Sequence, residues 1–372
     1  MADAGDLEGV ILSPGDEDPG AFGDTAAFSR GRGLKTLVDP QTYYYSTQPQ
    51  GRGRNHEAHR LELSELNWAQ DARSVAAHID RVGELNQAVN ANGLWIAPGP
   101  LQDTFADVWT PLAVQFARTA SQSWGPERTL VTLAVSESGL SDWQAISRWL
   151  DVVTTLPVRG FYLLVSRPST TYPSAPWPPQ KLGNLLRLVH ALAVLNEFEV
   201  VWGYSDFEGL LALSVGGTGI ASGWSYTLRQ FSSTKWTDPA TGGRPATVRT
   251  HLSKLWSLPR AEAETAQLLN STMREQIFTE AELNVLGAKP LSSISRVDAQ
   301  VSHLLCLAEK AAWLSHEDDL SARVRAVQTS LDESVELWNA IGHSGLLLEP
   351  QYQNRVTALR DALLSFQDHV AL

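Results

Sequence analysis

The chain has 372 residues, of which 43% are hydrophobic, and its formal net charge is -12. Because a single hydrophobic core stops growing near roughly 250 to 300 residues, we expect two domains. The acidic balance disfavours binding of nucleic acid or an anionic membrane, and favours a small-molecule substrate or a partner protein. The single cysteine, Cys306, excludes an internal disulfide and any metal site built from several cysteines, and we interpret it as a buried thiol.

The first twenty residues carry neither a basic start nor a long apolar run. No stretch of the chain approaches the roughly 20 apolar residues that a membrane helix needs. We therefore expect a cytoplasmic protein without a membrane segment.

Short apolar runs recur through the first 222 residues, and each is followed by polar residues or by Gly and Pro. The runs are 10–12, 36–38, 94–97, 130–135, 161–165, 200–203 and 219–222. Segments with a helical period lie between them, such as the face formed by Val75, Ile79 and Val82. A strand that is buried on both faces is a nearly continuous apolar run, and strands joined by helices lie parallel. The pattern predicts an α/β protein with a parallel sheet.

Two parallel architectures fit this pattern, a closed (β/α)8 TIM-like barrel, regular or irregular, and an open doubly wound sheet. We favour the barrel because no Gly-rich phosphate motif follows the first strand. Seven strands are visible, and the eighth is expected either between Tyr43 and Leu63 or in residues 247–255.

After Pro259 the strand-like runs stop and amphipathic helices follow. Their apolar stripes are Val297, Val301, Leu304, Leu305 and Ala308, then Val324, Val327, Leu331, Val335 and Trp338, and finally Val356, Leu359, Leu363 and Phe366. We expect these stripes to pack as a helical bundle or hairpin on the barrel. The predicted division is a β/α barrel domain at 1–258 and an α-helical C-terminal domain at 259–372.

Barrel enzymes carry their catalytic residues after the carboxyl ends of strands. Asp39, Glu137 and Asp206 hold such positions and are the predicted catalytic acid, base or nucleophile. Each also has a structural interpretation, since Asp39 precedes a proline in a turn, Glu137 can be solvated, and Asp206 can cap the helix that starts at Phe207.

The predicted substrate-binding residues surround these carboxylates. They are Arg167, Tyr204, Trp224, Arg229 and Lys235. An arginine at a strand end can bind a carboxylate or phosphate in a two-pronged contact, and an aromatic ring can stack on a sugar or nucleobase. The long segment 222–256, which carries three of the five, is either functional or a surface loop.

Several kinds of chemistry lack their motif. None of the nine histidines follows a predicted strand, and the chain has no Gly-x-Ser-x-Gly sequence. We therefore predict no metal and no cofactor, and disfavour acyl transfer by a nucleophilic serine or cysteine.

The favoured hypothesis is a metal-independent barrel enzyme acting on a polar, ring-containing small molecule or glycosyl group through strand-end carboxylates. The alternative is a catalytically inactive barrel scaffold whose helical C-terminal region binds a partner protein. A third, weaker hypothesis is a nucleic-acid-modifying barrel. Its phosphate track is Arg52, Arg54, Arg244, Arg249 and Lys254.

Overall fold

The strands of the protein pair only in parallel within the part of the chain that the computed structural model describes. That part comprises residues 7–47, 54–63, 71–89, 91, 93–168, 171–232, 247–288, 290–317 and 319–370. Strand β1 (Gly9–Leu12) pairs with β2 (Lys35–Val38). A second sheet has the order β3-β5-β6-β7-β8, and β4 also pairs with β5. Its strands are β3 (Trp95–Ala97), β4 (Leu101–Gln102), β5 (Thr129–Ser136), β6 (Gly160–Ser166), β7 (Glu199–Gly203) and β8 (Gly219–Ala221). The predicted parallel α/β fold is confirmed, and each predicted apolar run forms a strand.

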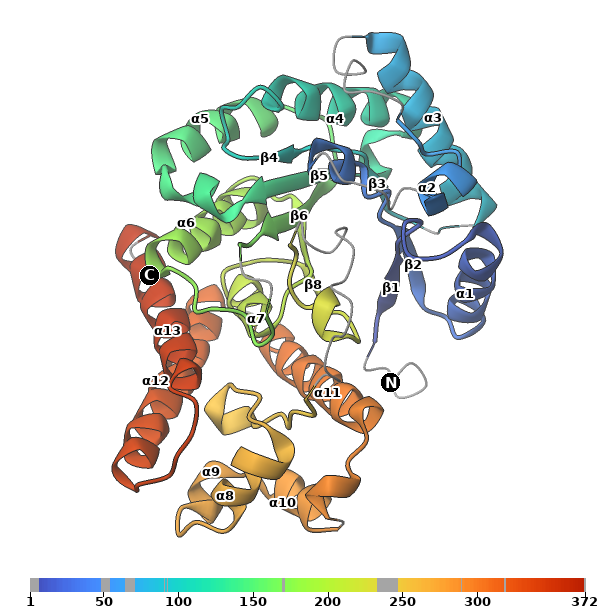
Figure 1. Ribbon diagram of the computed structural model, residues 1–372. Coiled ribbons are helices and arrows are strands. Elements are labelled where there is room, and N and C mark those ends of the chain that lie inside the picture. The colour runs from blue at the N-terminus through green and yellow to red at the C-terminus, as the bar shows by residue number, and fades with distance from the viewer. Residues whose placement is uncertain are drawn as a thin grey trace.

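Helices connect these strands and lie in an arc on their outer side (Figure 1). They are α1 (Pro19–Gly31), α2 (Arg54–Ala58), α3 (Ala72–Ala88), α4 (Thr110–Trp124), α5 (Trp143–Val153), α6 (Pro179–His190) and α7 (Phe207–Ser214). Aspartates begin three of them, since Asp18, Asp71 and Asp142 accept backbone N–H bonds of the first turns of α1, α3 and α5. The expected apolar face of α3 is buried.

Strand order follows chain order throughout the described residues. β2 lies beside β3, which continues the series from the first sheet to the second. A doubly wound sheet reverses its strand order at a switch point, and this series does not.

The two predicted places for an eighth strand are wrong for the residues described. Residues Thr42–Thr47 form a 3-10 helix, and α2 follows it. In 247–255, Arg249 and Leu252 make only isolated antiparallel bridges, to Arg260 and Ser257. The additional strand is the short β4, which the Gly/Pro-rich surroundings of Leu101 concealed.

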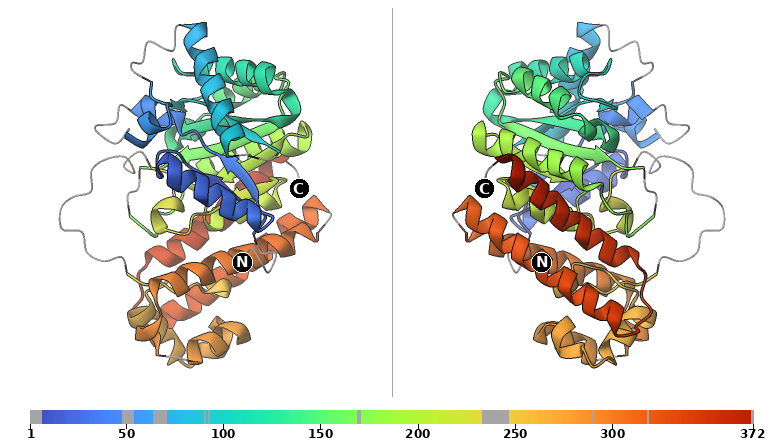
Figure 2. Two further views of the ribbon diagram at one scale, coloured as in Figure 1. Left: turned by 90° about the vertical axis from the view of Figure 1, so that its right-hand side faces the viewer. Right: turned by 90° about the vertical axis from the view of Figure 1, so that its left-hand side faces the viewer.

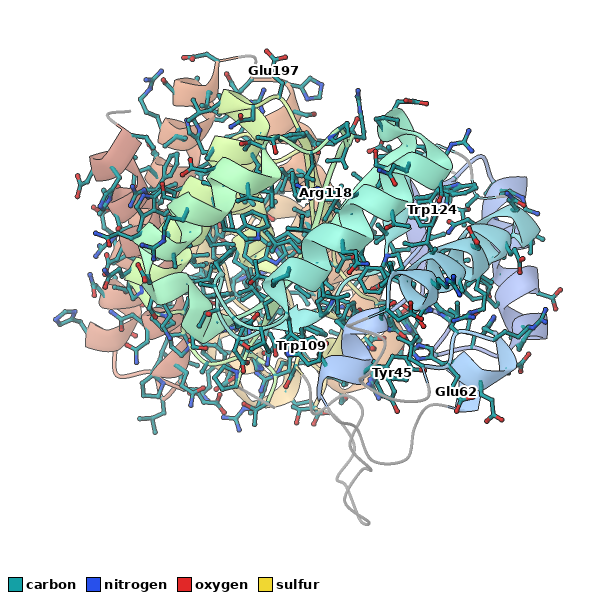
Figure 3. The ribbon with its side chains drawn as sticks, turned by 90° about the horizontal axis from the view of Figure 1, so that it is seen from above. Tyr45, Glu62, Trp109, Arg118, Trp124 and Glu197 are labelled. Atoms are coloured by element: carbon teal, nitrogen blue, oxygen red, sulfur yellow. The ribbon has the colours of Figure 1, made fainter. Side chains whose placement is uncertain are left out.

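Because the strands are parallel, their carboxyl ends form one rim and their amino ends form the opposite rim. Figure 3 shows Tyr45, Glu62 and Trp109, which follow carboxyl ends of strands, on one side of the molecule. Trp124 and Glu197, which precede strands, lie on the opposite side. The candidate residues therefore belong to the first of these rims.

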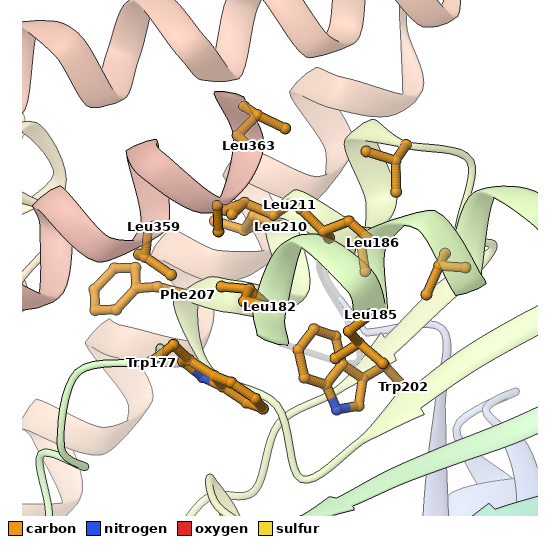
Figure 4. Packing of buried hydrophobic residues seen from close by; sticks show 14 of the residues in the cluster. Trp177, Leu182, Leu185, Leu186, Trp202, Phe207, Leu210, Leu211, Leu359 and Leu363 are labelled. Atoms are coloured by element: carbon orange, nitrogen blue, oxygen red, sulfur yellow. The ribbon is translucent and has the colours of Figure 1, made fainter. Parts of the chain in front are cut away.

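The C-terminal third is helical, as predicted, and packs on the β/α part (Figure 2). Its helices are α8 (Ala266–Leu269), α9 (Arg274–Ile277), α10 (Glu280–Gly287), α11 (Arg296–Ser315), α12 (Leu320–His343) and α13 (Gln351–Val370). Leu359 and Leu363 of α13 pack near Leu182 and Leu186 of α6 and Leu210 of α7 (Figure 4). One hydrophobic cluster thus contains residues from both sides of the predicted domain boundary at residue 258. That boundary remains a prediction.

Helix α11 packs through a different face from the one expected. Its stripe residues Val297 and Val301 are 52% and 38% exposed, whereas Gln300, His303 and Leu307 are buried. Two polar side chains, Gln300 and His303, therefore face the protein interior, where His303 lies against Asp206. Cys306, expected to be buried, is partly exposed, and burial of its thiol raises the pKa to about 11.

None of the helices in the described part of the chain has both the length and the apolar character to cross a membrane.

Candidate functional site

Asp39 follows β2 directly, is fully buried, and is bound by hydroxyl and amide donors. The Tyr43 hydroxyl donates to Oδ2 at 2.7 Å and the Tyr162 hydroxyl donates to the same oxygen at 3.3 Å. The backbone N–H of Gln41 donates to Oδ1 at 3.0 Å, which is the turn that the structural interpretation of Asp39 predicted. We call Asp39, Gln41, Tyr43, Tyr162 and Tyr204 the Asp39 centre.

Local structure explains how the two tyrosines reach one carboxylate. The 3-10 helix after β2 brings Tyr43 back over Asp39, four residues earlier in the chain. Tyr162 lies within β6, and its hydroxyl occupies space left by Gly203 of β7, where a Cβ atom would lie 2.5 Å from that oxygen. Gly203 is therefore required for the contact between Tyr162 and Asp39.

Two of the five non-glycine residues with a left-handed backbone in the described part of the chain belong to this centre. Gln41 and Tyr204 have φ angles of 52° and 54°, a left-handed conformation that residues other than glycine seldom adopt. The two strained residues meet, since the Gln41 side-chain amide donates to the Tyr204 hydroxyl at 3.2 Å. Such strain persists only where the surroundings enforce it, and it clusters at functional sites.

Both tyrosine donors keep their protons. Burial, and next the negative charge of Asp39, raise the pKa of Tyr43 and of Tyr162 well above its usual value. At neutral pH the centre therefore presents a carboxyl group flanked by two O–H donors.

Phe231 covers the centre. Its ring lies 5.0 Å from the Tyr43 ring and 5.5 Å from the Tyr204 ring, between centroids. The backbone N–H of Arg167 donates to the Phe231 carbonyl at 2.9 Å and fixes this segment at the end of β6. The predicted ligand Lys235 lies outside the described residues.

Glu137 and Arg167, two predicted site residues, form a buried ion pair. Arg167 Nε donates to Glu137 Oε2 at 2.9 Å, and Lys181 Nζ donates to Oε1 at 3.2 Å. The remaining Arg167 nitrogens donate to the carbonyls of Ala175 and Pro176. Glu137 is therefore not solvated, and Arg167 holds the loop after β6, with its guanidinium 4.1 Å from the ring centroid of Trp177.

Asp206 follows β7 and lies against the C-terminal helices. His303 Nε2 of α11 is 3.0 Å from Oδ1, and Arg355 Nη2 of α13 is 4.0 Å from Oδ2. The Tyr172 hydroxyl donates to Oδ2 at 2.8 Å. Although Asp206 stands at the start of α7, its side chain makes no capping bond there, so the capping interpretation is wrong. We call Asp206, Tyr172, His303 and Arg355 the Asp206 centre.

The charges around Asp206 determine its ionisation. Burial alone would raise the pKa of Asp206, but His303, Arg355 and Arg229 outweigh it and hold that pKa well below its usual range. Asp206 is an anion at neutral pH. Burial, and next the negative charge of Asp206, raise the pKa of Glu208. Glu208 lines a cavity of about 10 Å³ together with Trp177, Trp256 and Arg355. That volume is enough for about one water molecule.

Arg229 and Trp224 lie between β8 and Phe231. Arg229 is 1% exposed, and its guanidinium donates to the carbonyls of Gly223 and Trp224. These hydrogen bonds of Arg229 are thus with nearby backbone carbonyls. The Trp224 side chain is 56% exposed.

The residues of the predicted phosphate track are also engaged where they are described. Arg249 donates to the Leu258 carbonyl and the Tyr352 hydroxyl, and Lys254 donates to the Phe278 carbonyl at 2.9 Å. Arg52 and Arg244, and the side chain of Arg54, lie outside the described part.

Sequence reasoning missed most partners of the three carboxylates. Tyr162 had one signal, a hydroxyl group within the apolar run 161–165. His303 had none, because it belongs to a helix far along the chain from Asp206. Among the described residues, no three His, Cys, Asp or Glu side chains are arranged to hold a metal ion.

Comparison with protein-family models, with curated proteins and with solved structures finds no match to this chain.

Proposed function

We propose that the chain is an enzyme built on an irregular (β/α)8 barrel and that the Asp39 centre carries its chemistry. The observation that supports this most directly is the strained pair Gln41 and Tyr204, which meet beside a buried carboxylate that accepts two tyrosine O–H bonds. Strain of this kind is retained at active sites because it preorganises reacting groups.

Contacts across the strands support the barrel. From β3 to β7 the paired series β3-β5-β6-β7 has three steps of about 4.8 Å, which in a flat sheet would separate β3 from β7 by roughly 14 Å, and β2 lies beside β3. Yet Gln41, beyond β2, bonds Tyr204, beyond β7, at 3.2 Å. Side chains stand nearly perpendicular to a sheet, so this bond supports a series that curves around an interior.

The chemistry follows from the donors around Asp39. An ionised Asp39 would accept a proton from a C–H or O–H group of the substrate, and Tyr43 and Tyr162 would donate hydrogen bonds to an oxygen on which negative charge develops. Tyr204 and Phe231 would stack on the ring of a polar small molecule. The cover formed by Phe231 has to move for such a substrate to enter.

This arrangement favours proton transfer over glycoside hydrolysis. Hydrolysis of that kind uses two carboxyl groups on either side of the bond that breaks. Glu137 and Asp206 are engaged instead with Arg167 and with His303. We therefore propose an isomerase- or lyase-type reaction, with Asp39 as its base.

A thermal-shift screen tests the proposal, with monosaccharides, cyclitols and nucleosides as probes. A ligand at 100 times its dissociation constant stabilises the folded protein by about 2.7 kcal/mol. We expect at least one probe to raise the melting temperature of the wild type and of the exposed control Asp24→Asn, but not that of Asp39→Asn. A shift that survives Asp39→Asn would place the site elsewhere.

The scaffold hypothesis has its own supporting observation. Phe231 is 2% exposed and closes the centre, while the exposed Val297 and Val301 on α11 offer an apolar face to a partner protein. It predicts that no probe stabilises the wild type, whereas the enzyme hypothesis requires one that does.

A further inference from the structure

Residues 223–232, which we call the cover segment, connect the two centres. The segment ends with Phe231, whose ring covers Tyr43 and Tyr204. Its interior is fixed by Arg229, which donates from Nε to the Gly223 carbonyl at 2.9 Å and from Nη2 to the Trp224 carbonyl at 3.2 Å. A buried guanidinium that satisfies backbone carbonyls holds a loop in one conformation.

The same arginine reaches the Asp206 centre. Arg229 Nη1 donates to the Tyr172 hydroxyl at 3.5 Å, and that hydroxyl donates to Asp206. The Tyr172 ring also stacks on Tyr226 of the cover segment, with centroids 4.5 Å apart and planes at 10°. Tyr172 thus contacts the cover segment through both its ring and its hydroxyl.

The C-terminal helices touch this connection at two points. His303 of α11 lies 3.0 Å from Asp206, and Arg296, at the start of the same helix, places its guanidinium 5.7 Å from the Tyr226 ring centroid. Arg355 of α13 approaches Asp206 from the other side. A shift of α11 would therefore change contacts at Asp206 and at Tyr226 of the cover segment.

We infer that the C-terminal helices control access to the Asp39 centre, with Tyr172 and Arg229 as positioning residues that transmit the state of Asp206 to Phe231. This inference rests on the proposed function of the Asp39 centre, because it concerns regulation of that site. The physical basis is a continuous set of contacts from α11 to Phe231, in which a change at one end alters the hydrogen bonds available at the next.

Hydrogen exchange measured by mass spectrometry on the full chain tests the connection. Tyr172→Phe keeps the ring stack and removes the hydroxyl, so we expect amide exchange in 223–232 and 42–47 to rise on the order of fivefold, as for the loss of one hydrogen bond. Arg296→Ala, at an exposed position, should raise exchange in 223–232 by a smaller factor.

Tyr352→Phe is the matched control. The Tyr352 hydroxyl also donates to a buried carboxylate, Glu264, and accepts from an arginine, Arg249, and neither partner belongs to the cover segment. Exchange in 223–232 should stay unchanged in this variant. Unchanged exchange in Tyr172→Phe, or an equal increase in Tyr352→Phe, would overturn the inference.

The two proposals fail separately. Exchange reports the connection without any ligand, so a positive exchange result with ligand binding that ignores Asp39→Asn would reject only the proposed function. Binding that requires Asp39, with no change of exchange in Tyr172→Phe, would reject only the regulation.

Discussion

Asp39 and Asp206 are both buried aspartates just beyond the carboxyl end of a strand, but the side chains that contact them among the described residues differ. Hydroxyl and amide groups donate to Asp39, from Tyr43, Tyr162 and Gln41. The guanidinium of Arg355 lies 4.0 Å from Asp206, and the imidazole of His303 lies 3.0 Å from it. The same residue type at equivalent positions of the fold thus serves two different purposes.

The groups that surround a buried carboxylate decide whether it is structural or reactive. A buried anion that faces cations from other elements fixes those elements, and its removal leaves the cations uncompensated. A buried anion held by O–H donors stays available to accept a proton, because the donors can turn to another oxygen. On this basis Asp206 anchors α11 and α13, and Asp39 is the better candidate for chemistry.

The largest predicted effect is a loss of stability in acid that originates beside the Asp39 centre. His78 contacts the Thr42 hydroxyl at 3.0 Å, and burial first, then Arg81 and His56, lower its pKa from 6.5 to about 3. The unfolded chain binds this proton at a higher pH than the folded protein does, so His78 destabilises the fold progressively as pH falls from 6.5 towards 3. At about 1.4 kcal/mol per pKa unit, the full effect is on the order of 5 kcal/mol.

Urea unfolding between pH 7 and 4 measures this loss. His78→Gln should flatten the dependence, whereas substitution of the exposed His369 should leave it unchanged. A slope that is identical in wild type and His78→Gln would contradict the assignment. Burial also lowers the pKa of His251 and of His303, so part of the slope should remain in His78→Gln.

The second largest predicted effect is a difference in the free energy of unfolding between variants of the two aspartates. Asp206→Ala should lower the free energy of unfolding by about 3–5 kcal/mol, because it leaves Arg355 without its anion and removes the buried polar partner of His303 and Tyr172. Asp39→Asn should lower it by about 1–2 kcal/mol, since it weakens the hydrogen bonds from Tyr43 and Tyr162. Denaturant unfolding followed by tryptophan fluorescence measures both, with Asp361→Ala, at the surface, as the control. Equal losses for Asp39→Asn and Asp206→Ala would remove the distinction between the centres.

The smallest effect concerns strain. Gln41→Gly releases about 1 kcal/mol of left-handed strain but loses the bond to Tyr204, so its net effect on stability should stay within about 0.5 kcal/mol. Glu197, exposed and at a φ of 60°, is the matched control, and Glu197→Gly should stabilise the protein by about 1 kcal/mol. Probe binding should weaken in Gln41→Gly alone. If both glycine variants bind equally well, the strain at Gln41 has no functional role.

Much of the fold follows from local pattern. The run 130–135 is apolar at every position except Thr132, which fits a strand covered on both faces, and it forms β5. The helix over Ala72–Ala88 is predicted in the same way by its apolar period. The short β4 and the packed face of α11 were not predictable, because pairing with β5 creates the first and polar partners elsewhere in the chain select the second.

The candidate site was predictable only in part. The positions of Asp39, Glu137 and Asp206 after strands follow from the sequence, and so does the proximity of Glu137 and Arg167 at neighbouring strand ends. The partners of Asp39 and Asp206 come from residues up to 149 positions away, as Arg355 does from Asp206. No local pattern specifies such contacts.

The sequence by itself determined the parallel α/β character, the order of strands and helices, and the rim at which polar residues gather, because each depends on side-chain periodicity and on the direction of successive strands. Only the tertiary structure decided which donors surround each aspartate, that Phe231 covers one of them, and that α11 turns His303 inward. Those outcomes depend on packing and charge neutralisation between distant segments, and no single stretch of the sequence determines them.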